Sequence, residues 1–575
     1  MIDLTWKIGG EAGYGIMSSG LIFAKAALRS GYFIYDLNEY PSLIRGGHNT
    51  YTVRISDGEI YSQVKPVNLL VALNQNAIDF HKDELSQGAA LIVNTDKVDQ
   101  EKIKISKGVN LFPVPLIKLA KEVDGKEIMM NTVAIGASMA LLKGDFEVLT
   151  EVIKDFFKGK EKIEELNIKA AKLGFDFIKN NFNKIEFSFS LPKKNRDNGM
   201  LLTGNDAIAL GAVKAGLKFF ACYPMTPINS LLAYFAKQGP ELKIVYIQPE
   251  DEISGINMAI GASFAGARSM VATSGGGFSL MTEAFGLAGI TETPLVIIEG
   301  QRPGPATGLP TWGAQGDLRF VLHAAQDDFP RIVLAPGDPE ECFWLTIEAF
   351  NLAEIYQAPA VILTDKHLGE SHQSVADFED SKAKIDRGFM LSKDDQLKEY
   401  KRYQFTENGI SPRGIPGRKG FTFRANSDEH NEYGFSNEEA EVRKNQVEKR
   451  MRKMETLAKK IPNPNIYGPD KAEFTLIGWG SAKGPILEAQ KALETENVKT
   501  NFLHLTYMNP FPSQFVADFL KGKKNVLMVE QNSTAQCAGL IRERTGITIK
   551  NHLLKYDGRP FFPEEIAEKV KELWK

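Results

Sequence analysis

The chain is poor in the residues that build disulfide scaffolds and metal clusters. Its 575 residues contain three cysteines, Cys222, Cys342 and Cys537, and no Cys-x-x-Cys pair. Three widely separated thiols cannot form a disulfide framework, and they are too few to ligate an iron–sulfur cluster without help. The composition therefore excludes a disulfide-rich fold and a cysteine-ligated cluster held by this chain alone.

Neither an excess of one charge nor a long apolar run is present. The 69 Lys and Arg residues nearly balance the 72 Asp and Glu residues, for a formal charge of -3, so no basic field would attract phosphates. No apolar run reaches the roughly 20 residues that a membrane-spanning helix needs. The first seven residues also lack the basic region and apolar core of a secretory signal. We expect a soluble cytoplasmic protein without nucleic-acid or membrane partners.

Short apolar runs dominate the middle of the chain instead. Residues 242–247, 269–272 and 295–298 are typical of central strands in a parallel sheet. Ligands of open α/β sheets bind outside the carboxyl ends of such strands. Three polar side chains, Thr226, Glu252 and Arg302, come close after predicted strands. We therefore expect these three residues to gather at one rim of a parallel sheet.

Three motifs occur in order between residues 223 and 308. They are Tyr223-Pro224-Met225-Thr226-Pro227, the Glu252 that precedes a helix of small residues, and Gln301-Arg302-Pro303-Gly304-Pro305-Ala306-Thr307-Gly308. This region resembles the pyrimidine-binding domain of the 2-oxoacid:ferredoxin oxidoreductases, which depend on thiamine diphosphate. Three ordered motifs within roughly eighty residues are far more specific than any one alone.

The resemblance implies a catalytic role for Glu252. In the family a carboxylic acid lies against N1′ of the cofactor's pyrimidine and moves the proton that tautomerises the ring. Glu250 is a rival two residues earlier, but the spacing of small residues after Glu252 matches the family and favours Glu252. Alanine and glycine neighbours would raise its pKa toward neutrality. The alternative is that an acid here merely favours a helix N-terminus.

The resemblance also implies two substrate-binding residues, Arg302 and Thr226. A guanidinium offers a two-pronged hydrogen bond to the carboxylate of a 2-oxoacid, and a hydroxyl can add another. The alternatives are a surface-loop arginine and a threonine that caps the next helix. Tyr223, Pro224 and Gly255 are weaker candidates for the cofactor pocket.

The N-terminal third resembles the γ domain of the same family, which is a separate subunit in many members. A strand over residues 4–8 leads into the glycine-rich turn 9–15, which contains Gly13, and a helix over 16–30 follows. A second feature is the loop Tyr40-Pro41-Ser42-Leu43-Ile44-Arg45-Gly46-Gly47-His48. Glycines let a backbone approach a phosphate, so Gly13 and Arg45 are candidates for contact with CoA or a nucleotide. A purely structural role for both stays open.

We expect a multidomain α/β protein with parallel sheets. Its parts are a γ domain (1–185), a pyrimidine-binding domain (196–373), a linker excursion with a charged helix (374–462) and a transketolase C-terminal-like domain (463–575). Asn205 or Asp206 should cap the helix that opens the second part. The acidic stretch 428–432 contains one histidine and is interpreted as a solvated loop, so no metal site is expected. The helix over 437–460 is interpreted as a surface or packing helix.

The chain lacks half of what the resemblance requires. In the family a Gly-Asp-Gly segment binds the cofactor's diphosphate through a divalent metal. The nearest approach here is Gly337-Asp338-Pro339, whose third residue is wrong. A separate β subunit is therefore implied, carrying the diphosphate site with Mg²⁺ and a [4Fe-4S] cluster and passing electrons to ferredoxin. The assembly would be a heterodimer or a dimer of heterodimers, with thiamine diphosphate shared between the subunits.

The leading hypothesis is the fused γα subunit of a CoA-dependent 2-oxoacid:ferredoxin oxidoreductase. It would convert a 2-oxoacid of the 2-oxoglutarate or pyruvate class to acyl-CoA and CO₂. Length and layout resemble the 2-oxoglutarate type most. Two alternatives are an aryl-pyruvate oxidoreductase relative and a nucleotide-binding regulatory or scaffolding subunit.

Overall fold

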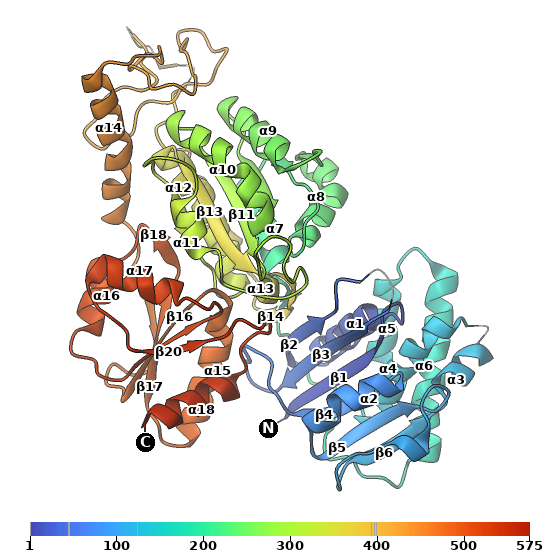
Figure 1. The fold of residues 1–575 in the computed structure, drawn as a ribbon. Helices are drawn as coiled ribbons and strands as arrows, with labels where there is room; N and C mark the ends of the chain where they lie inside the picture. The colour runs from blue at the N-terminus through green and yellow to red at the C-terminus, as the bar shows by residue number, and fades with distance from the viewer. Residues whose placement is uncertain are drawn as a thin grey trace. The chain divides into compact units, whose positions relative to one another are not determined.

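The computed structural model describes residues 2–43, 46–123, 125–392, 394–395, 397 and 399–574. The chain forms two compact units, which Figure 1 colours along the sequence. The first unit contains the described residues up to Leu202, together with Ser371–Asp377 and Phe562–Glu565. The second contains Thr203–Glu370, Phe378–Phe561 and the remaining C-terminal residues.

The first unit is built on an eight-stranded sheet with the order β6-β5-β4-β1-β3-β2-β14-β7. Its strands are β1 (Asp3–Glu11), β2 (Phe33–Glu39), β3 (His48–Ser56), β4 (Val67–Ala72), β5 (Leu85–Asn94), β6 (Asn110–Val114), β7 (Met200–Leu202) and β14 (Gln373–Val375). Strands β1, β4, β5 and β6 run parallel, and β3 pairs antiparallel with β1 and β2. Residues 200–202 and 373 were assigned to the second part from the sequence, yet they complete this first sheet.

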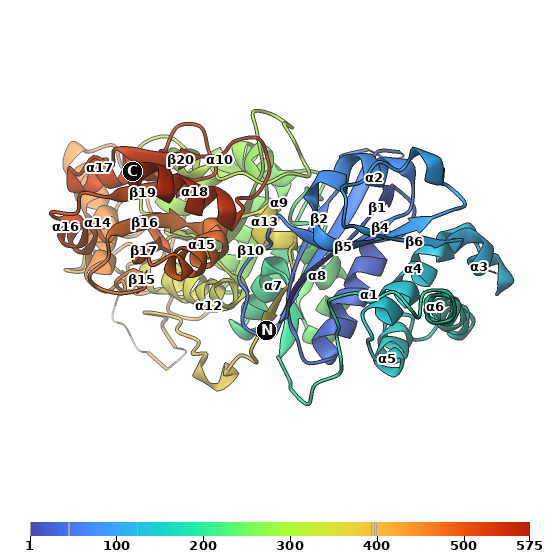
Figure 2. The ribbon, with the colours of Figure 1, turned by 90° about the horizontal axis from the view of Figure 1, so that it is seen from below.

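Helices cover both faces of the first sheet (Figure 2). One face carries α1 (Ile16–Arg29), α3 (Leu116–Glu122), α4 (Met130–Leu141), α5 (Phe146–Phe156) and α6 (Glu161–Asn181), and the other carries α2 (Gln75–His81). Short 3₁₀ turns occupy Lys82–Glu84, Gln100–Lys102 and Glu127–Met129. Helices α4 and α6 can approach closely because Gly136 and Gly174 have no Cβ. A Cβ at either position would collide with the backbone of the other helix.

The N-terminal turn differs from the prediction in one respect. Strand β1 continues through Gly9 and Gly10, which pair with Thr50 and Asn49, so the turn spans only residues 12–15. Gly15 has φ 71° and precedes α1, a left-handed conformation that glycine adopts without a Cβ penalty. The prediction of a strand, a glycine turn and a helix is confirmed, with the strand extended.

The second unit contains a seven-stranded sheet with the order β18-β12-β13-β11-β10-β8-β9. Its strands are β8 (Phe219–Ala221), β9 (Val245–Ile247), β10 (Ser269–Thr273), β11 (Leu295–Gln301), β12 (Ile332–Leu334), β13 (Pro359–Asp365) and β18 (Tyr507–Asn509). All pairs are parallel except β12 with β18. The strand predicted over 242–247 is shorter, because Leu242 ends the preceding helix.

Helices sandwich this parallel sheet. One face packs against α9 (Glu252–Phe264), α10 (Gly275–Ile290) and α11 (Leu318–His323). The other packs against α7 (Gly204–Lys214), α8 (Asn229–Leu242) and α12 (Pro339–Tyr356), while the short α13 (Lys366–Glu370) follows β13. The predicted cap of α7 was wrong by two residues or more. Thr203 is the N-cap, and Asp206 completes a capping box with it.

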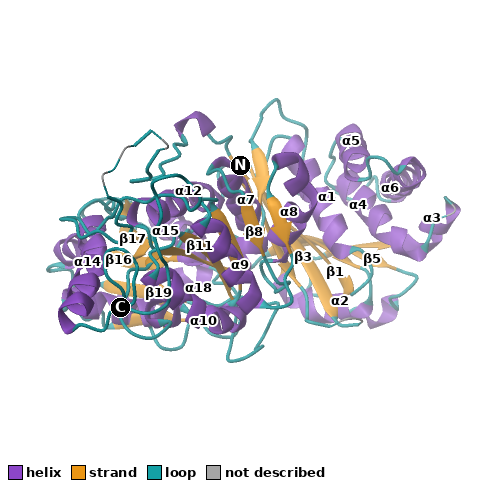
Figure 3. Ribbon diagram, turned by 90° about the horizontal axis from the view of Figure 1, so that it is seen from above, coloured by secondary structure: helices purple, strands orange, loops and turns teal. Residues whose placement is uncertain are grey.

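The second unit also contains a five-stranded sheet with the order β15-β17-β16-β19-β20. Its strands are β15 (Asn465–Tyr467), β16 (Phe474–Trp479), β17 (Thr500–Leu505), β19 (Val526–Glu530) and β20 (Asn551–Leu554). The accompanying helices are α15 (Lys483–Thr495), α16 (Ser513–Leu520), α17 (Gln536–Thr545) and α18 (Pro563–Trp574). Figure 3 distinguishes these strands from the helices by colour. No helix in the described ranges is long and apolar enough to cross a membrane.

The linker excursion ends in α14 (Ala440–Ala458), which buries part of its cationic side rather than only lying on the surface. Lys449 and Lys453 are fully buried, and both form ion pairs with Glu292, which follows the C-cap of α10. The acidic stretch 428–432 was wrongly interpreted as merely solvated. Glu429 accepts hydrogen bonds from Arg443 and Arg450 of α14, so this stretch fixes the helix in place.

Candidate active site

The predicted rim exists at the carboxyl ends of four neighbouring parallel strands. Thr226 lies in the segment after β8, Glu252 begins α9 after β9, and Arg302 directly follows β11. The order β11-β10-β8-β9 places these ends next to one another. The structure thus brings the three predicted residues to one edge of the sheet, where α/β proteins bind ligands.

Glu252 is the only one of the two rival carboxylates that is buried. Glu252 is only 3 % exposed. Glu250 is exposed and accepts a hydrogen bond from the Ser254 hydroxyl at 3.1 Å. The helix cap is supplied separately by Asp251, which accepts from the Ser254 amide at 2.8 Å. The geometry favours Glu252 over Glu250, and it gives Glu252 no part in capping.

The Glu252 carboxyl is buried, and one of its oxygens has no hydrogen-bond partner among the described residues. No described residue hydrogen-bonds to its Oε1, and a Cβ at Gly277 would lie 2.5 Å from this atom. A glycine at the start of α10 is therefore needed to accommodate the carboxyl. Burial raises the pKa of Glu252, and the neighbouring Asp251 charge raises it further.

The wall beside Glu252 comes from β10 and the segment after β8. A Cβ at Gly277 would also collide with Thr273 Oγ1, so Thr273 and Glu252 flank the same glycine. Thr273 in turn contacts Met225 Sδ at 3.9 Å. Cys222 is buried nearby, and desolvation raises the pKa of its thiol with a further contribution from Glu252. This thiol is therefore protonated at neutral pH.

Arg302 and Thr226 contact each other directly. Arg302 Nη1 donates to the backbone oxygen of Thr226 at 2.8 Å, while the buried Nε of Arg302 has no partner in the described part of the chain. Helix α8 begins after Ile228 and has no side-chain cap, so Thr226 is not its capping residue. Its hydroxyl accepts a 3.4 Å hydrogen bond from Asn229.

The weaker candidates for the cofactor pocket and for CoA that the structure describes make no side-chain hydrogen bond or ion pair with Thr226, Glu252 or Arg302. Tyr223 (38 % exposed) and Pro224 lie exposed on the rim, and a Cβ at Gly255 would meet only Pro249, at 3.3 Å. Gly13 belongs to the first unit and has φ 95°, with no described atom within 4 Å of a Cβ built there. Arg45 lies outside the described residues.

Sequence reasoning missed two acidic residues beside Arg302. Glu299 lies in β11 and is completely buried, and Asp317 follows the Arg302 loop. Gln301, the last residue of β11, links Asp317 to β13, since its Oε1 accepts from the Asp317 amide at 3.1 Å and its Nε2 donates to Thr364 O at 3.2 Å. A charged residue directly after the apolar run 295–298 was the signal that could have revealed Glu299.

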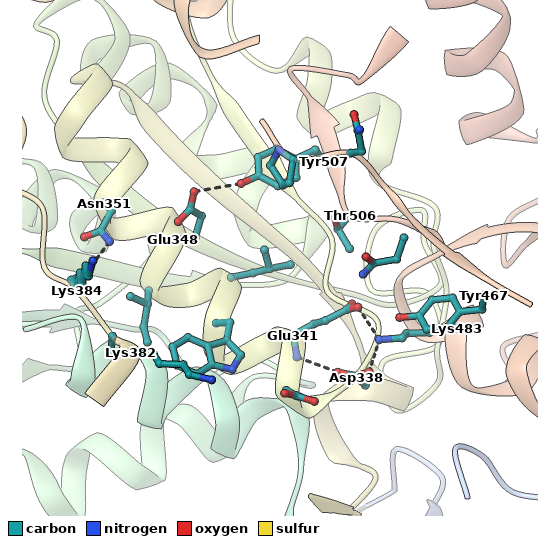
Figure 4. Close-up of a pocket in the computed structure, with 18 residues that line it drawn as sticks. Asp338, Glu341, Glu348, Asn351, Lys382, Lys384, Tyr467, Lys483, Thr506 and Tyr507 are labelled. Carbon is teal, nitrogen blue, oxygen red and sulfur yellow. Dashed lines mark hydrogen bonds and ion pairs between the residues drawn. The ribbon is translucent and has the colours of Figure 1, made fainter. Parts of the chain in front are cut away.

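A cavity of about 680 Å³ lies elsewhere in the second unit, with no residue of the rim in its lining (Figure 4). Lys483 is held there between Asp338 and Glu341, and His504 contacts Glu341 at 2.8 Å. Tyr507 donates to Glu348 at 3.2 Å. Asp338 is the middle residue of Gly337-Asp338-Pro339, the nearest approach to Gly-Asp-Gly in the sequence. It caps α12 and forms an ion pair with Lys483. Within the described residues, no group of three His, Cys, Asp or Glu could hold a metal.

Models of known protein families match nearly the whole chain. "Pyruvate ferredoxin/flavodoxin oxidoreductase" matches residues 5–177. "Pyruvate flavodoxin/ferredoxin oxidoreductase, thiamine diP-bdg" matches residues 210–449, and "Pyruvate:ferredoxin oxidoreductase core domain II" matches residues 472–566. The second of these ranges contains Thr226, Glu252 and Arg302.

Individual relatives agree with these models. The 2-oxoacid:ferredoxin oxidoreductase subunit alpha of Sulfolobus sp. is 35 % identical over 98 % of this chain and 96 % of its own length. The 2-oxoglutarate synthase subunit KorA of Methanothermobacter marburgensis is 31 % identical over 64 % of this chain and 97 % of its own. The structure of a 2-oxoglutarate:ferredoxin oxidoreductase from Magnetococcus marinus, with 2-oxoglutarate, coenzyme A and succinyl-CoA bound, is 34 % identical. It superposes with a TM-score of 0.93 over 100 % of both chains.

Proposed function

Because the chain belongs to the family of 2-oxoacid:ferredoxin oxidoreductase alpha subunits, we propose that it is the fused γα subunit of a CoA-dependent enzyme of this kind. The enzyme oxidises a 2-oxoacid to acyl-CoA and CO₂. The relatives are enzyme subunits by name, which argues against a purely scaffolding role. The shorter KorA relative matches only 64 % of this chain, in keeping with a γ part fused to an α part here.

The observation that carries the proposal is the buried Glu252 carboxyl with its unpartnered Oε1. A carboxyl that carries its proton can donate to a ring nitrogen, and burial raises the pKa of Glu252, which favours the protonated form. These residues fit the pyrimidine end of thiamine diphosphate. When bound, that cofactor supplies the carbanion chemistry that cleaves the bond next to a 2-oxo group. The chain's own part is to hold and move one proton at Glu252.

Arg302 and Thr226 are proposed to bind the substrate's 1-carboxylate. Their direct contact fixes the guanidinium at the rim, so little conformational entropy is lost on binding. The 2-oxoglutarate in the related structure supports that oxoacid class as the substrate. For CoA, Gly13 of the first unit and the sequence candidate Arg45 stay proposals, and Tyr223, Pro224 and Gly255 stay candidates for the cofactor pocket.

The rim is proposed to be completed by a second protein. Several large apolar side chains are exposed around Glu252, on α9, on α10 and in neighbouring segments: Tyr223, Ile253, Met258, Leu280 and Leu309. Exposed apolar groups gathered at a site are typical of interfaces. A β subunit docked here, carrying the diphosphate site with Mg²⁺ and a [4Fe-4S] cluster, would supply what this chain lacks. We also expect transfer to ferredoxin, a heterodimer or its dimer, and a cytoplasmic location.

The first prediction is that the purified chain alone does not reduce viologen with 2-oxoglutarate and CoA. Co-expression with the β gene product should give a complex that does, because the diphosphate and electron-transfer parts are then present. Oxoacid-dependent viologen reduction is the measurement. Reduction by the chain without a second protein would refute the proposed division of labour.

A second prediction separates substrate binding from cofactor activation. Arg302→Lys should raise KM for 2-oxoglutarate about tenfold or more, because a charge-assisted hydrogen bond is worth roughly 1.5–3 kcal/mol and a point charge cannot replace the planar fork. Thr226→Val should raise KM less. Steady-state kinetics of the complex test this. Slowed proton exchange in the cofactor without substrate would instead mean that Arg302 supports the cofactor.

A further inference from the structure

The cavity of about 680 Å³ in the second unit has no part in the mechanism above. Helix α12 forms one wall, because its lining positions 341, 344, 348 and 351 are spaced three or four residues apart and therefore share one face. The other walls come from residues 382–384, 506–507 and several between 462 and 467, and from Lys483 (Figure 4). A cavity of this volume accommodates a small organic molecule.

Most charged side chains of the cavity are already neutralised by one another or by a neighbour. Lys483 forms ion pairs with Asp338 and, at 2.5 Å, with Glu341. Lys382 forms an ion pair with Glu379 at 2.6 Å. These groups have charge partners within the protein, so they do not by themselves call for a charged ligand.

Glu348 is different, because it has no cation beside it. Its carboxylate accepts a hydrogen bond from the Tyr507 hydroxyl at 3.2 Å and forms no ion pair with any described residue. Burial raises the pKa of Glu348, since the charged form is held partly away from water. The ammonium group of a ligand would stabilise this carboxylate through a charge-assisted hydrogen bond.

Lys384 supplies an unpaired charge of the opposite sign. Asn351, one turn after Glu348 on the same face of α12, donates to the backbone oxygen of Lys384 at 2.8 Å and so fixes this residue against the helix. Figure 4 shows Glu348, Asn351 and Lys384 along one side of the cavity. Lys384 is exposed, and its Nζ forms no ion pair within the described ranges. An anionic group near Glu348 would therefore find a cation at the same wall.

We propose that this cavity binds a free amino acid, whose ammonium pairs with Glu348 and whose carboxylate pairs with Lys384. The amino acid's side chain would pack against Trp344 and Leu345, which line the cavity one turn before Glu348. A polyamine would bring ammonium groups against Lys384, and a phosphate would lie against Glu348, so neither matches one charge of each sign. No residue of the Glu252 rim lines the cavity, and the site does not depend on the proposed function.

The test is isothermal titration of the full-length chain with L-phenylalanine and with two analogues that each lack one charged group. 3-Phenylpropionate has no ammonium and should bind about tenfold more weakly or worse, because the charge-assisted hydrogen bond to Glu348 is lost. Phenethylamine has no carboxylate and should lose a smaller factor, because Lys384 is exposed and its ion pair is screened by water. The absence of saturable binding of L-phenylalanine at millimolar concentration would overturn the proposal. Equal affinity for all three compounds, or tighter binding of spermidine, would overturn it as well.

Variants locate the binding within the cavity. Glu348→Gln keeps an acceptor for the Tyr507 hydroxyl, so the fold should be retained, but it loses the charge and should weaken L-phenylalanine binding about tenfold or more. Lys384→Met should weaken it by a smaller factor. Lys382→Met is the matched control, because Lys382 lines the same cavity but already pairs with Glu379, and affinity should stay within about twofold. Wild-type affinity in Glu348→Gln, or equal losses in the two lysine variants, would contradict the assigned contacts.

Discussion

Replacing Glu252 by glutamine should slow proton exchange at C2 of bound thiamine diphosphate by about 10²–10⁴-fold, the usual contribution of a positioned general acid–base group. The amide has nearly the same size and shape as the carboxyl and fits the same place beside Gly277, so the cofactor should still bind. It cannot give and take the proton that a carboxyl exchanges. NMR-detected exchange in the assembled complex, without substrate, measures this step directly.

Glu250→Gln is the matched control for that result. Glu250 is exposed and bonds only to Ser254 among the contacts in the described part of the chain, so exchange should stay within about twofold, as surface substitutions usually cost little. Fast exchange in Glu252→Gln together with slow exchange in Glu250→Gln would show that the catalytic carboxyl had been assigned to the wrong residue.

Replacing Glu292 by glutamine should lower the free energy of unfolding of the second unit by about 3–5 kcal/mol, because it leaves buried charges uncompensated. Glu292 is completely buried and faces Lys449 at 2.5 Å as well as Lys453. Burial lowers the pKa of Lys449 to about 7 and that of Lys453 to about 8. The single negative charge of Glu292 therefore faces two lysines and cannot neutralise both. Denaturant titration of the chain measures the loss.

Lys453→Met is the matched control for Glu292→Gln. It removes one of two lysines and leaves Glu292 paired with Lys449, so it should destabilise far less, or stabilise. The cations around Glu292 lower its pKa, so its contribution to stability is present above its ordinary pKa and is lost as pH falls below that value. A chain in which Lys453→Met costs as much as Glu292→Gln would contradict this account of the cluster.

The sequence by itself determined the class of fold, and it predicted that three candidate residues would lie at one edge of a sheet. The runs 269–272 and 295–298 are largely apolar on both faces, a pattern that only doubly covered parallel strands require, and the structure confirms them as β10 and β11. Since parallel strands end at one edge, the residues after them had to meet there. Thr226 and Arg302 do so, in direct contact. The absence of Gly-Asp-Gly and of cysteine pairs likewise predicted an incomplete cofactor site.

Only the tertiary structure decided which residues that are distant in sequence come together. Residues 200–202 and 373 join the first sheet although the chain between them forms part of the second unit. Helix α14, which is rich in charged residues, is fixed at Lys449 by Glu292, 157 residues earlier in the sequence. Hydrophobic periodicity is a local signal that repeats along the chain, whereas an ion pair depends on two side chains whose separation in sequence carries no pattern.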